Sequence, residues 1–411
     1  MQKNVGNCLV AQSGGPTAVI NSSLYGVLAA AMKCKTIDKI YGGLHGIEGI
    51  IDGKIINILD FPSKILKQIK YSPAAALGSC RYRLKDFNEG KDDYIKIFEA
   101  FEKYNIRYFF YIGGNDSMDT ADKINKYADE IGYDIKVIGI PKTIDNDLMF
   151  TDHCPGYGSA AKYIATTTLE IALDTEVYPK NTINVLEVMG RNAGWLTASA
   201  ALVREKIPWL KHLIYIPEIV FDENKFLEDV ENAYKRNGNI FIAVSEGIVD
   251  KNGEYVSKRN NMYTEDAFGH AHLGGVGDYI EKIIKDNIYK RVKMVRLGTT
   301  QRCAMHFASK TDFEEAEVLG ERAVEFAIRG ISGKMVSIVR KSNYPYVYDI
   351  DIVDLNKVCN KEKKIPLSMI NEEGNNVTKE FIEYARPLIY GEIDLPFIDG
   401  LPHYTNLKYS V

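Results

Sequence analysis

Short β-rich runs alternate with helical stretches along most of this 411-residue chain, and this order constrains the fold more than any other feature. Strands separated by helices predict parallel sheets covered by helices. After about Gly330 the sequence becomes more polar and rich in Tyr and Lys, which predicts a looser segment. The expected strands are Asn7–Gln12, Tyr108–Ile112, Lys136–Ile140, Thr182–Val188, His212–Ile216 and Ile240–Ser245, and the expected helices are Thr17–Met32, Asp93–Tyr104, Ser117–Ile131, Ser159–Glu176, Ala193–Val203 and Glu223–Arg236.

Composition excludes several classes of protein. Hydrophobic residues make up 45% of the chain, enough for a large core, and the length predicts two or three domains. The 51 Lys and Arg are balanced by 55 Asp and Glu, so the basic excess that supports nucleic-acid binding is missing. No run of 18 apolar residues and no signal-peptide pattern is present, so we expect a cytoplasmic protein that does not bind membranes.

A glycine pair follows the first expected strand. Gly14 and Gly15 form a turn that leads into a helix, where backbone N–H groups and the helix N-terminus can bind an anion. The segment fits neither GxxxxGK[ST] nor GxGxxG, and a lone Gly-Gly turn before a helix is most often ordinary turn chemistry. This motif therefore suggests a phosphate site only in combination with others.

Two further polar segments follow strands. Gly113–Ser117 again combines glycines with polar side chains before a helix, and Pro141–Asp147 brings a cation, a hydroxyl and carboxylates into seven residues. In parallel sheets the ligand lies beyond the carboxyl ends of the strands, which is where these segments fall. An Asn-Asp turn after Pro is the simpler explanation of the second segment.

Six segments together resemble the phosphofructokinase family in order and spacing. They are Gly14–Asn21, Gly113–Ser117, Pro141–Asp147, Met189–Gly194, Ser245–Gly247 and Leu297–Arg302. The stretch Phe381–Glu392 is similar to the C-terminal region of the pyrophosphate-dependent branch of that family. The resemblance therefore covers nearly the whole chain.

The resemblance implies an α/β fold of two similar three-layer domains with parallel sheets that face a cleft. Residues 1–156 with about 301–350 would bind the phosphoryl donor, residues 157–300 would bind fructose 6-phosphate, and residues 351–411 would form a C-terminal extension packed on the body. A homodimer is expected, with a homotetramer as the alternative.

The resemblance also implies the roles of single residues. Transfer of a phosphoryl group to a sugar hydroxyl needs a base, and cations for the transferring oxygens. Asp145 is implied to take the proton from the fructose 1-hydroxyl, with Lys142, Asp116 and Arg81 beside the transferring phosphate, although Arg81 alone would fit an exposed loop. The residues implied to bind pyrophosphate are Gly14, Gly15 and Lys142, and those implied to bind the sugar phosphate are Thr143, Ile144, Asp145, Met189, Gly190, Arg191, Glu246, Thr299, Thr300, Gln301 and Arg302.

Two positions indicate the phosphoryl donor. In the ATP branch of the family, glycines stand where this chain has Asp116 and Lys142. A carboxylate at Asp116 would repel the α-phosphate of ATP, while Lys142 can reach pyrophosphate, so we expect the two to act as a pair that selects pyrophosphate. An ATP-dependent enzyme is the alternative, and a nonactive regulatory homologue that binds sugar phosphates is another. The intact Asp145 favours an enzyme.

The resemblance implies Mg²⁺ as the cofactor. Asn115 stands where the family has an acidic magnesium contact. A neutral amide still offers a carbonyl oxygen but lacks the charge that Mg²⁺ prefers. Asp116, Asp145 or Asp147 is therefore expected to share the metal.

Overall fold

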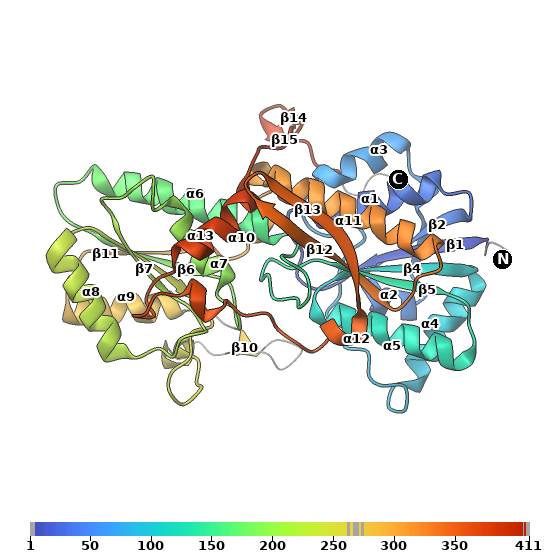
Figure 1. Cartoon of the computed structure of the whole chain (residues 1–411), viewed down its shortest axis with the longest axis horizontal. Helices are drawn as coiled ribbons and strands as arrows, with labels where there is room; N and C mark the ends of the chain where they lie inside the picture. Colours follow the sequence, from blue (N-terminus) through green and yellow to red (C-terminus); the bar gives the residue numbers. More distant parts are fainter. Residues whose placement is uncertain (1–4, 261–263, 266–270, 273–274, 406, 408–411) are drawn as a thin grey trace. The chain divides into compact units, whose positions relative to one another are not determined.

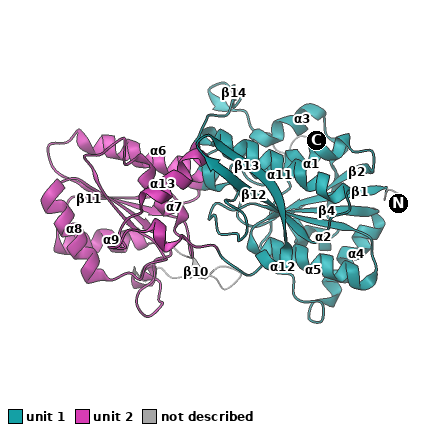
Figure 2. Cartoon of the chain, viewed as in Figure 1, with its two compact units in different colours: residues 1–159, 302–362, 390–411 teal, residues 160–301, 363–389 magenta. Residues whose placement is uncertain are grey.

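The structure is a computed structural model that describes residues 5–260, 264–265, 271–272, 275–405 and 407 (Figure 1). The chain divides into two compact units (Figure 2). Unit 1 comprises residues 1–159, 302–362 and 390–411, and unit 2 comprises 160–301 and 363–389. The chain passes from one unit to the other at 159/160, 301/302, 362/363 and 389/390. The tail differs from expectation, because 351–411 is shared between the units and does not form one extension.

Unit 1 is built on a seven-stranded sheet of order β13-β12-β5-β4-β1-β2-β3. Neighbours from β12 to β2 are parallel, and the edge strands β13 and β3 are antiparallel to their neighbours. The chain leaves β1 for β2 on one side and later returns to β4 on the other, so β1 and β4 flank the point where the strand order reverses. The strands are β1 (Gly6–Gln12), β2 (Ile37–Gly43), β3 (Ile55–Asn57), β4 (Ile106–Gly113), β5 (Lys136–Pro141), β12 (Lys334–Asn343) and β13 (Tyr346–Asp354).

Helices cover both faces of this sheet, giving three layers. Alternating residues of β1 enter separate cores, with Cys8 and Val10 in one and Leu9 and Ala11 in the other. The first core includes helices α1 (Ile20–Lys33) and α11 (Lys310–Ile328). The second includes α2 (Gly46–Ile51), α4 (Lys91–Lys103), α5 (Asn115–Ile131) and α12 (Leu355–Val358).

Unit 2 has a four-stranded parallel sheet of order β11-β6-β8-β7. The order reverses between β6 and β8, because the chain goes from β6 to β7 on one side and from β8 to β11 on the other. Its strands are β6 (Ile183–Val188), β7 (Lys211–Tyr215), β8 (Ile240–Ser245) and β11 (Val292–Arg296), and its core includes α8 (Glu223–Asn237) and α9 (Val276–Asn287). Other elements of the chain are α3 (Ser63–Gln68), α6 (Tyr157–Glu176), α7 (Trp195–Ala198), α10 (Thr300–Cys303), α13 (Lys379–Ala385), β9 (Thr264–Glu265), β10 (Ala271–His272), β14 (Phe397–Ile398) and β15 (Leu401–Pro402).

The expected α/β class is confirmed, with two local corrections. The helix expected at Ala193–Val203 is the short α7 followed by a 3₁₀ helix at Ser199–Val203. The prediction of a looser segment after Gly330 is wrong, because β12 and β13 form a hairpin on the edge of the unit 1 sheet. Alternate residues of β13, including Tyr348 and Ile350, pack on the first core of unit 1.

Candidate active site

The glycine turn after β1 is joined to the loop that carries Arg81. Gly14 adopts φ of +76°, a left-handed conformation that glycine tolerates. Its N–H donates to the carbonyl of Cys80 at 3.0 Å, and the Ser79 hydroxyl donates to the Gly14 carbonyl at 2.6 Å. These bonds bring the segment around Arg81 to the glycine turn, as the sequence analysis expected.

Lys142 extends from the end of β5 to the same turn. Its backbone N–H donates to Gly113 at the end of β4 at 2.9 Å, which aligns the two strand ends. Its ammonium donates to the Gly15 carbonyl at 2.6 Å and would lie 3.2 Å from a Cβ placed on Gly14. Only 2% of Lys142 is exposed. A buried cation therefore forms part of the glycine turn, at the point where the strand order reverses.

The charges around Lys142 define a cluster. Burial lowers the pKa of the Lys142 ammonium to about 8, with Asp145 and Asp147 acting against this shift and Arg302 and Arg81 adding to it. A side chain at Gly15 would lie 3.2 Å from a guanidinium nitrogen of Arg302. The structure thus brings three cations and two carboxylates together, an arrangement that suits a compact polyanion.

The segment Thr143–Asp147 is held by its own hydrogen bonds. The Thr143 hydroxyl accepts from the Asp145 N–H at 3.1 Å, and the Thr143 N–H donates to Pro155 at 3.2 Å. Asn146 has φ of +55° and is buried, with its side-chain oxygen accepting from Cys154 N–H at 3.0 Å. The turn fixes the backbone on both sides of Asp145, while Ile144 is buried in the same segment.

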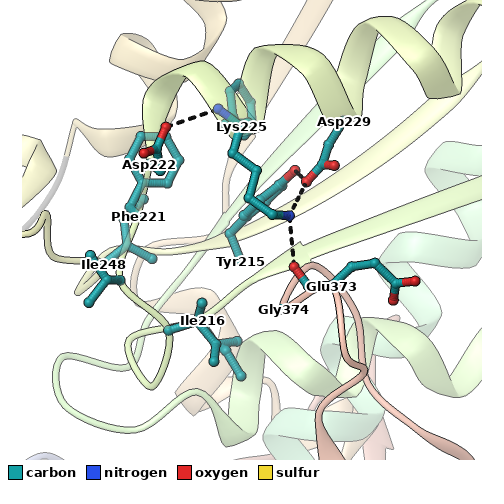
Figure 3. A pocket seen from close by; sticks show the side chains of 12 residues that line it. Tyr215, Ile216, Phe221, Asp222, Lys225, Asp229, Ile248, Glu373 and Gly374 are labelled. Carbon is teal, nitrogen blue, oxygen red and sulfur yellow. Dashed lines mark hydrogen bonds and ion pairs between the residues drawn. The ribbon is translucent and has the colours of Figure 1, made fainter.

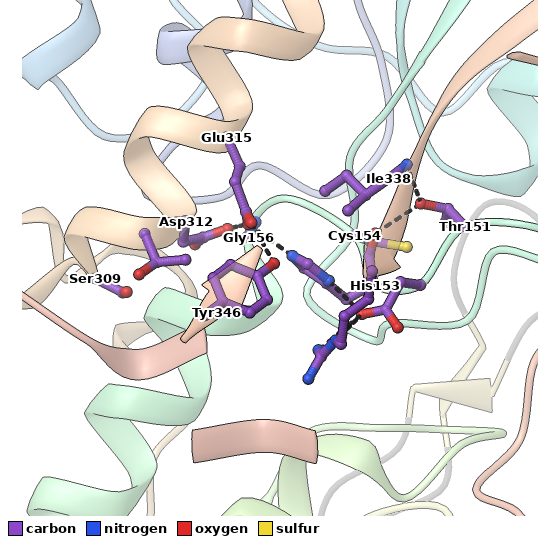
Figure 4. Close-up of polar contacts among 12 residues, drawn as sticks. Thr151, His153, Cys154, Gly156, Ser309, Asp312, Glu315, Ile338 and Tyr346 are labelled. Atoms are coloured by element: carbon purple, nitrogen blue, oxygen red, sulfur yellow. Dashed lines mark hydrogen bonds and ion pairs between the residues drawn. The ribbon is translucent and has the colours of Figure 1, made fainter. Parts of the chain in front are cut away.

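A buried polar cluster supports the chain that follows this segment (Figure 4). His153 contacts Glu315 of α11 at 2.6 Å and Asp152 at 2.8 Å, and Asp152 pairs with Arg340 of β12 at 2.7 Å. Burial opposes the charge on His153, but Glu315 and Asp152 outweigh it and raise its pKa to about 9. The cluster ties the segment after Asp147 to α11 and the β12–β13 hairpin.

Asp312 fixes the start of α6 in the same region. Its carboxylate accepts from the N–H of Gly156 at 2.8 Å and from the N–H of Ser159 at 2.9 Å. The pKa of Asp312 is raised to about 6 by burial, with these donors acting in the opposite direction. Neither Asp312 nor His153 was identified from the sequence, because each acts through partners far away in the chain.

Asn115 and Asp116 lie at the start of α5. The side-chain oxygen of Asn115 accepts from the N–H of Asn360 at 2.6 Å, and its amide nitrogen donates to the carbonyl of Lys361. Asp116 is exposed. No hydrogen bond or ion pair joins Asp116 to Lys142, both of them described residues, and their expected joint selection of pyrophosphate stays a prediction.

In unit 2 the loops after β6 and β8 meet. The Met189 N–H donates to the side-chain oxygen of Gln301 at 3.1 Å, and the Gly190 N–H approaches a Glu246 carboxylate oxygen at 3.4 Å. The Ser245 hydroxyl donates to the Gly190 carbonyl at 2.5 Å. Gly190 has φ of +130°, and a Cβ there would lie 2.7 Å from the Ala193 carbonyl. The predicted sugar residues of both loops are therefore adjacent.

The segment Leu297–Arg302 is divided between the units. Thr299 and Thr300 are exposed in unit 2, and Thr300 accepts from the Tyr163 hydroxyl at 3.1 Å. Arg302 belongs to unit 1, beside Gly15, and its expected contact with a 6-phosphate stays a prediction. Arg191 is part of the loop after β6, and its carbonyl would be 1.9 Å from a Cβ on Gly247.

Glu218 is a site-supporting residue that the sequence analysis missed. One of its oxygens accepts from the Gly194 N–H at 2.9 Å and from the Ile365 N–H at 3.0 Å. A side chain on Gly194 would lie 2.5 Å from Ile216, so only glycine allows this approach. Burial raises the pKa of Glu218, against the effect of these donors. Glu218 lies just after β7. The rule that ligands bind beyond the carboxyl ends of parallel strands could therefore have indicated it.

A separate pocket in unit 2 contains none of the predicted site residues (Figure 3). Apolar side chains such as Phe221, Phe226 and Ile248 line it. The Lys225 ammonium contributes to its polar side and bonds to Asp229 at 3.1 Å. Because Lys225 is already paired there, this pocket suggests no role in phosphoryl transfer.

Candidate membrane spans and metal-binding groups are both absent from the described residues. No helix among them is long and apolar enough to cross a membrane. Within the same residues, no group of three or more His, Cys, Asp and Glu side chains is arranged to hold a metal ion.

Comparisons with known proteins relate this chain to one family. A phosphofructokinase family profile matches residues 7–327. The pyrophosphate–fructose 6-phosphate 1-phosphotransferases of Methylococcus capsulatus and Halomonas elongata are 40% and 41% identical to this chain, over 98% of it and 96% of each relative. A crystal structure of the pyrophosphate-dependent phosphofructokinase from Nitrosospira multiformis matches with a TM-score of 0.88 and 38% identity, covering 98% of this chain and 96% of that one. This chain belongs to the phosphofructokinase family.

Proposed function

We propose that this chain transfers a phosphoryl group from pyrophosphate to the 1-hydroxyl of D-fructose 6-phosphate. The products are fructose 1,6-bisphosphate and phosphate, a step of glycolysis. The close relatives in the family carry this activity in their names. The observation that carries the proposal is the buried Lys142 ammonium at the glycine turn, where the ATP branch of the family has glycine.

Asp145 is the proposed base. It takes the proton from the 1-hydroxyl as the sugar oxygen bonds to phosphorus and the bridging P–O bond of pyrophosphate breaks. The leaving phosphate keeps the electron pair of that bond. Lys142 and Arg81 offset the negative charge that shifts to it. The electrostatic interactions of Lys142 with Asp145 and Arg81 support these roles.

The lysine also explains the preference for a small donor. Its ammonium occupies the space next to Gly14 and Gly15. Pyrophosphate brings charge without a nucleoside, so it needs only the cations and backbone N–H groups of this turn. Asp116, exposed at the start of α5, adds charge repulsion against a longer donor.

The sugar phosphate is assigned to the loops of unit 2. Glu246 accepts hydrogen bonds from sugar hydroxyls, and Arg191 donates to the substrate. Met189, Gly190, Thr299, Thr300 and Gln301 complete the proposed contacts. Their support is the adjacency of the loops after β6 and β8.

A magnesium ion fits the carboxylates of Asp145 and Asp147. In phosphoryl transfer Mg²⁺ is usually held by one or two carboxylates with phosphate oxygens and water. When bound, it would neutralise charge on the phosphate oxygens. Asn115 fits less well as a ligand, because its amide is bonded to Asn360 and Lys361.

A coupled assay tests the proposed function. The production of fructose 1,6-bisphosphate is followed with either pyrophosphate or ATP as the donor, and Asp145→Asn serves as the inactive control. We expect a higher kcat/KM with pyrophosphate. A preference for ATP would support the ATP-dependent alternative, and binding of fructose 6-phosphate without turnover by either donor would support a regulatory homologue. We also propose a cytoplasmic homodimer, which light scattering and cell fractionation test.

A further inference from the structure

The segment that follows β13 and α12 is attached to the proposed donor motif. Asn115 bonds through both ends of its amide, accepting from Asn360 N–H at 2.6 Å and donating to the Lys361 carbonyl. The Asn360 side chain adds a bond to Asp119 of α5 at 3.0 Å. All of these contacts lie within unit 1. The first end of the segment is therefore fixed on α5, the helix that starts within the donor motif.

The next residues of the same segment are attached to the proposed sugar motif in unit 2. The Trp195 indole N–H donates to the Lys363 carbonyl at 3.0 Å, and the Lys363 ammonium lies 5.4 Å from the Trp195 ring centre. The Ile365 N–H donates to Glu218 at 3.0 Å. The same carboxylate holds the Gly194 N–H of the sugar loop at 2.9 Å.

We propose that residues 360–365 form a tether between the two substrate motifs, with Asn115 and Glu218 as positioning residues. The tether holds Gly113–Ser117 at one end and Met189–Gly194 at the other, so binding of one substrate affects the loop that binds the second. This inference rests on the proposed function, because that function assigns the two motifs to the two substrates.

The chemistry of Asn115 supports this role. One peptide offers an N–H and the next offers a carbonyl, and an amide side chain can pair with both, whereas a carboxylate would set an oxygen against the Lys361 carbonyl. Asn115 stands where the family has an acidic residue. The amide that replaces the carboxylate bonds to Asn360 and Lys361 of the C-terminal segment. Asn360 has φ of +59°, a conformation that Asn and Gly accept more readily than other residues.

Cross-effects on the Michaelis constants test the tether. Asn115→Ala should raise the KM for fructose 6-phosphate about 5-fold or more, and Glu218→Ala should raise the KM for pyrophosphate by a similar factor. Each change lies in the half that binds the other substrate. In the double variant the KM for each substrate should be no higher than in the single variant of its own half, because that change already releases the tether. Asn360→Gly, which keeps the backbone conformation but loses the bond to Asp119, should weaken the tether less than Asn360→Ala, which disturbs both.

Variants that alter only the KM of their own half, or whose cross-effects multiply, would overturn the proposal. Hydrogen exchange gives a second measurement that does not depend on activity. In Asn115→Ala, the amides of Gly194 and Ile365 should exchange several-fold faster, and unchanged exchange would also overturn the tether. A wild type without pyrophosphate-dependent activity would refute the proposed function, while the exchange measurement would still decide on the tether.

Discussion

The two proposed substrate motifs are built in different ways. In unit 1, charged side chains gather around the buried Lys142, which interacts with Asp145, Asp147, Arg81 and Arg302. In unit 2, side-chain oxygens mainly accept hydrogen bonds from the backbone of the loop after β6, as Glu246, Glu218 and Gln301 do. Charge is concentrated in the first unit, and loop shape is fixed in the second.

The difference matches what each half has to do. A phosphoryl transfer moves charge, so the donor half needs charges that are already in place before the reaction. A sugar is recognised largely through neutral hydroxyls, so the sugar half needs a loop held in one conformation. Substitutions in unit 1 should therefore affect turnover most, and those in unit 2 should affect binding most.

Asp145→Asn should have the largest effect and tests whether turnover depends on unit 1. A carboxamide keeps the shape of the side chain but cannot take the proton, so kcat should fall about 10²–10⁴-fold. The KM for fructose 6-phosphate should change little. Steady-state kinetics measure both constants, and near wild-type turnover would assign the base to another group.

Lys142→Met should follow, because it removes the charge but keeps most of the volume. We expect kcat with pyrophosphate to fall about 10²–10³-fold. Lys142→Gly should lower pyrophosphate activity similarly and permit weak ATP activity, and Asp116→Gly should shift the donor ratio less, since Asp116 is exposed. The ratio of kcat/KM for the two donors is the measurement. An unchanged ratio in all three variants would contradict donor selection by these residues.

Arg302→Ala should have an intermediate effect. It tests a residue that belongs to unit 1 but is predicted to bind the sugar phosphate. If it binds the 6-phosphate, the KM for fructose 6-phosphate should rise about 10-fold or more. Arg302 also lowers the pKa of Lys142, so the pKa of the lysine should rise when it is removed. Wild-type activity should fall as the pH rises through about 8, and this alkaline limb should move upward in the variant. A change in kcat alone would contradict the role in binding.

Substitutions of two buried histidines should have the smallest effect on activity. They compare the two units through the pH dependence of the stability of the fold. The pKa of His153 in unit 1 is raised to about 9, against burial, by Glu315 and Asp152, so its stabilisation is complete below about 6.5 and is lost as the pH rises through 9. His212 in unit 2 has a pKa lowered to about 4 by burial, with Arg204 adding, so its stabilisation is present above 6.5 and is lost as the pH falls through 4.

The melting temperature between pH 6.5 and 9 therefore tests His153. His153→Gln should flatten the fall of the melting temperature in this range, while His212→Leu should leave that fall in place. A wild type with constant melting temperature over this range would contradict the assignment of charge to His153.

Local patterns in the sequence were enough to predict the parallel sheets and the ends of most strands. Val137–Ile140, for example, is apolar and is followed at once by the polar segment with Lys142 and Asp145, so both the strand and its functional end were visible. The hairpin of β12 and β13 was missed because its polar residues dominate the composition. Alternation at Tyr346, Tyr348 and Ile350 was the signal that remained.

The missed parts of the site depend on long-range contacts. His153 and Glu315 are 162 residues apart in the sequence, and Asn115 and Asn360 are 245 apart. No periodicity within a segment can indicate such pairs. The joint donor selection by Asp116 and Lys142 stays a prediction, because adjacency of motifs in a site does not determine which side chains meet.

The edges of the unit 1 sheet limit how copies of this chain can associate. One edge strand, β3, has only three residues, and the other, β13, carries Asp349 and Asp351 along its length. A second copy paired there would bring like charges together, and short or charged edges resist such pairing. Extension of the unit 1 sheet between molecules is thereby disfavoured at both of its edges.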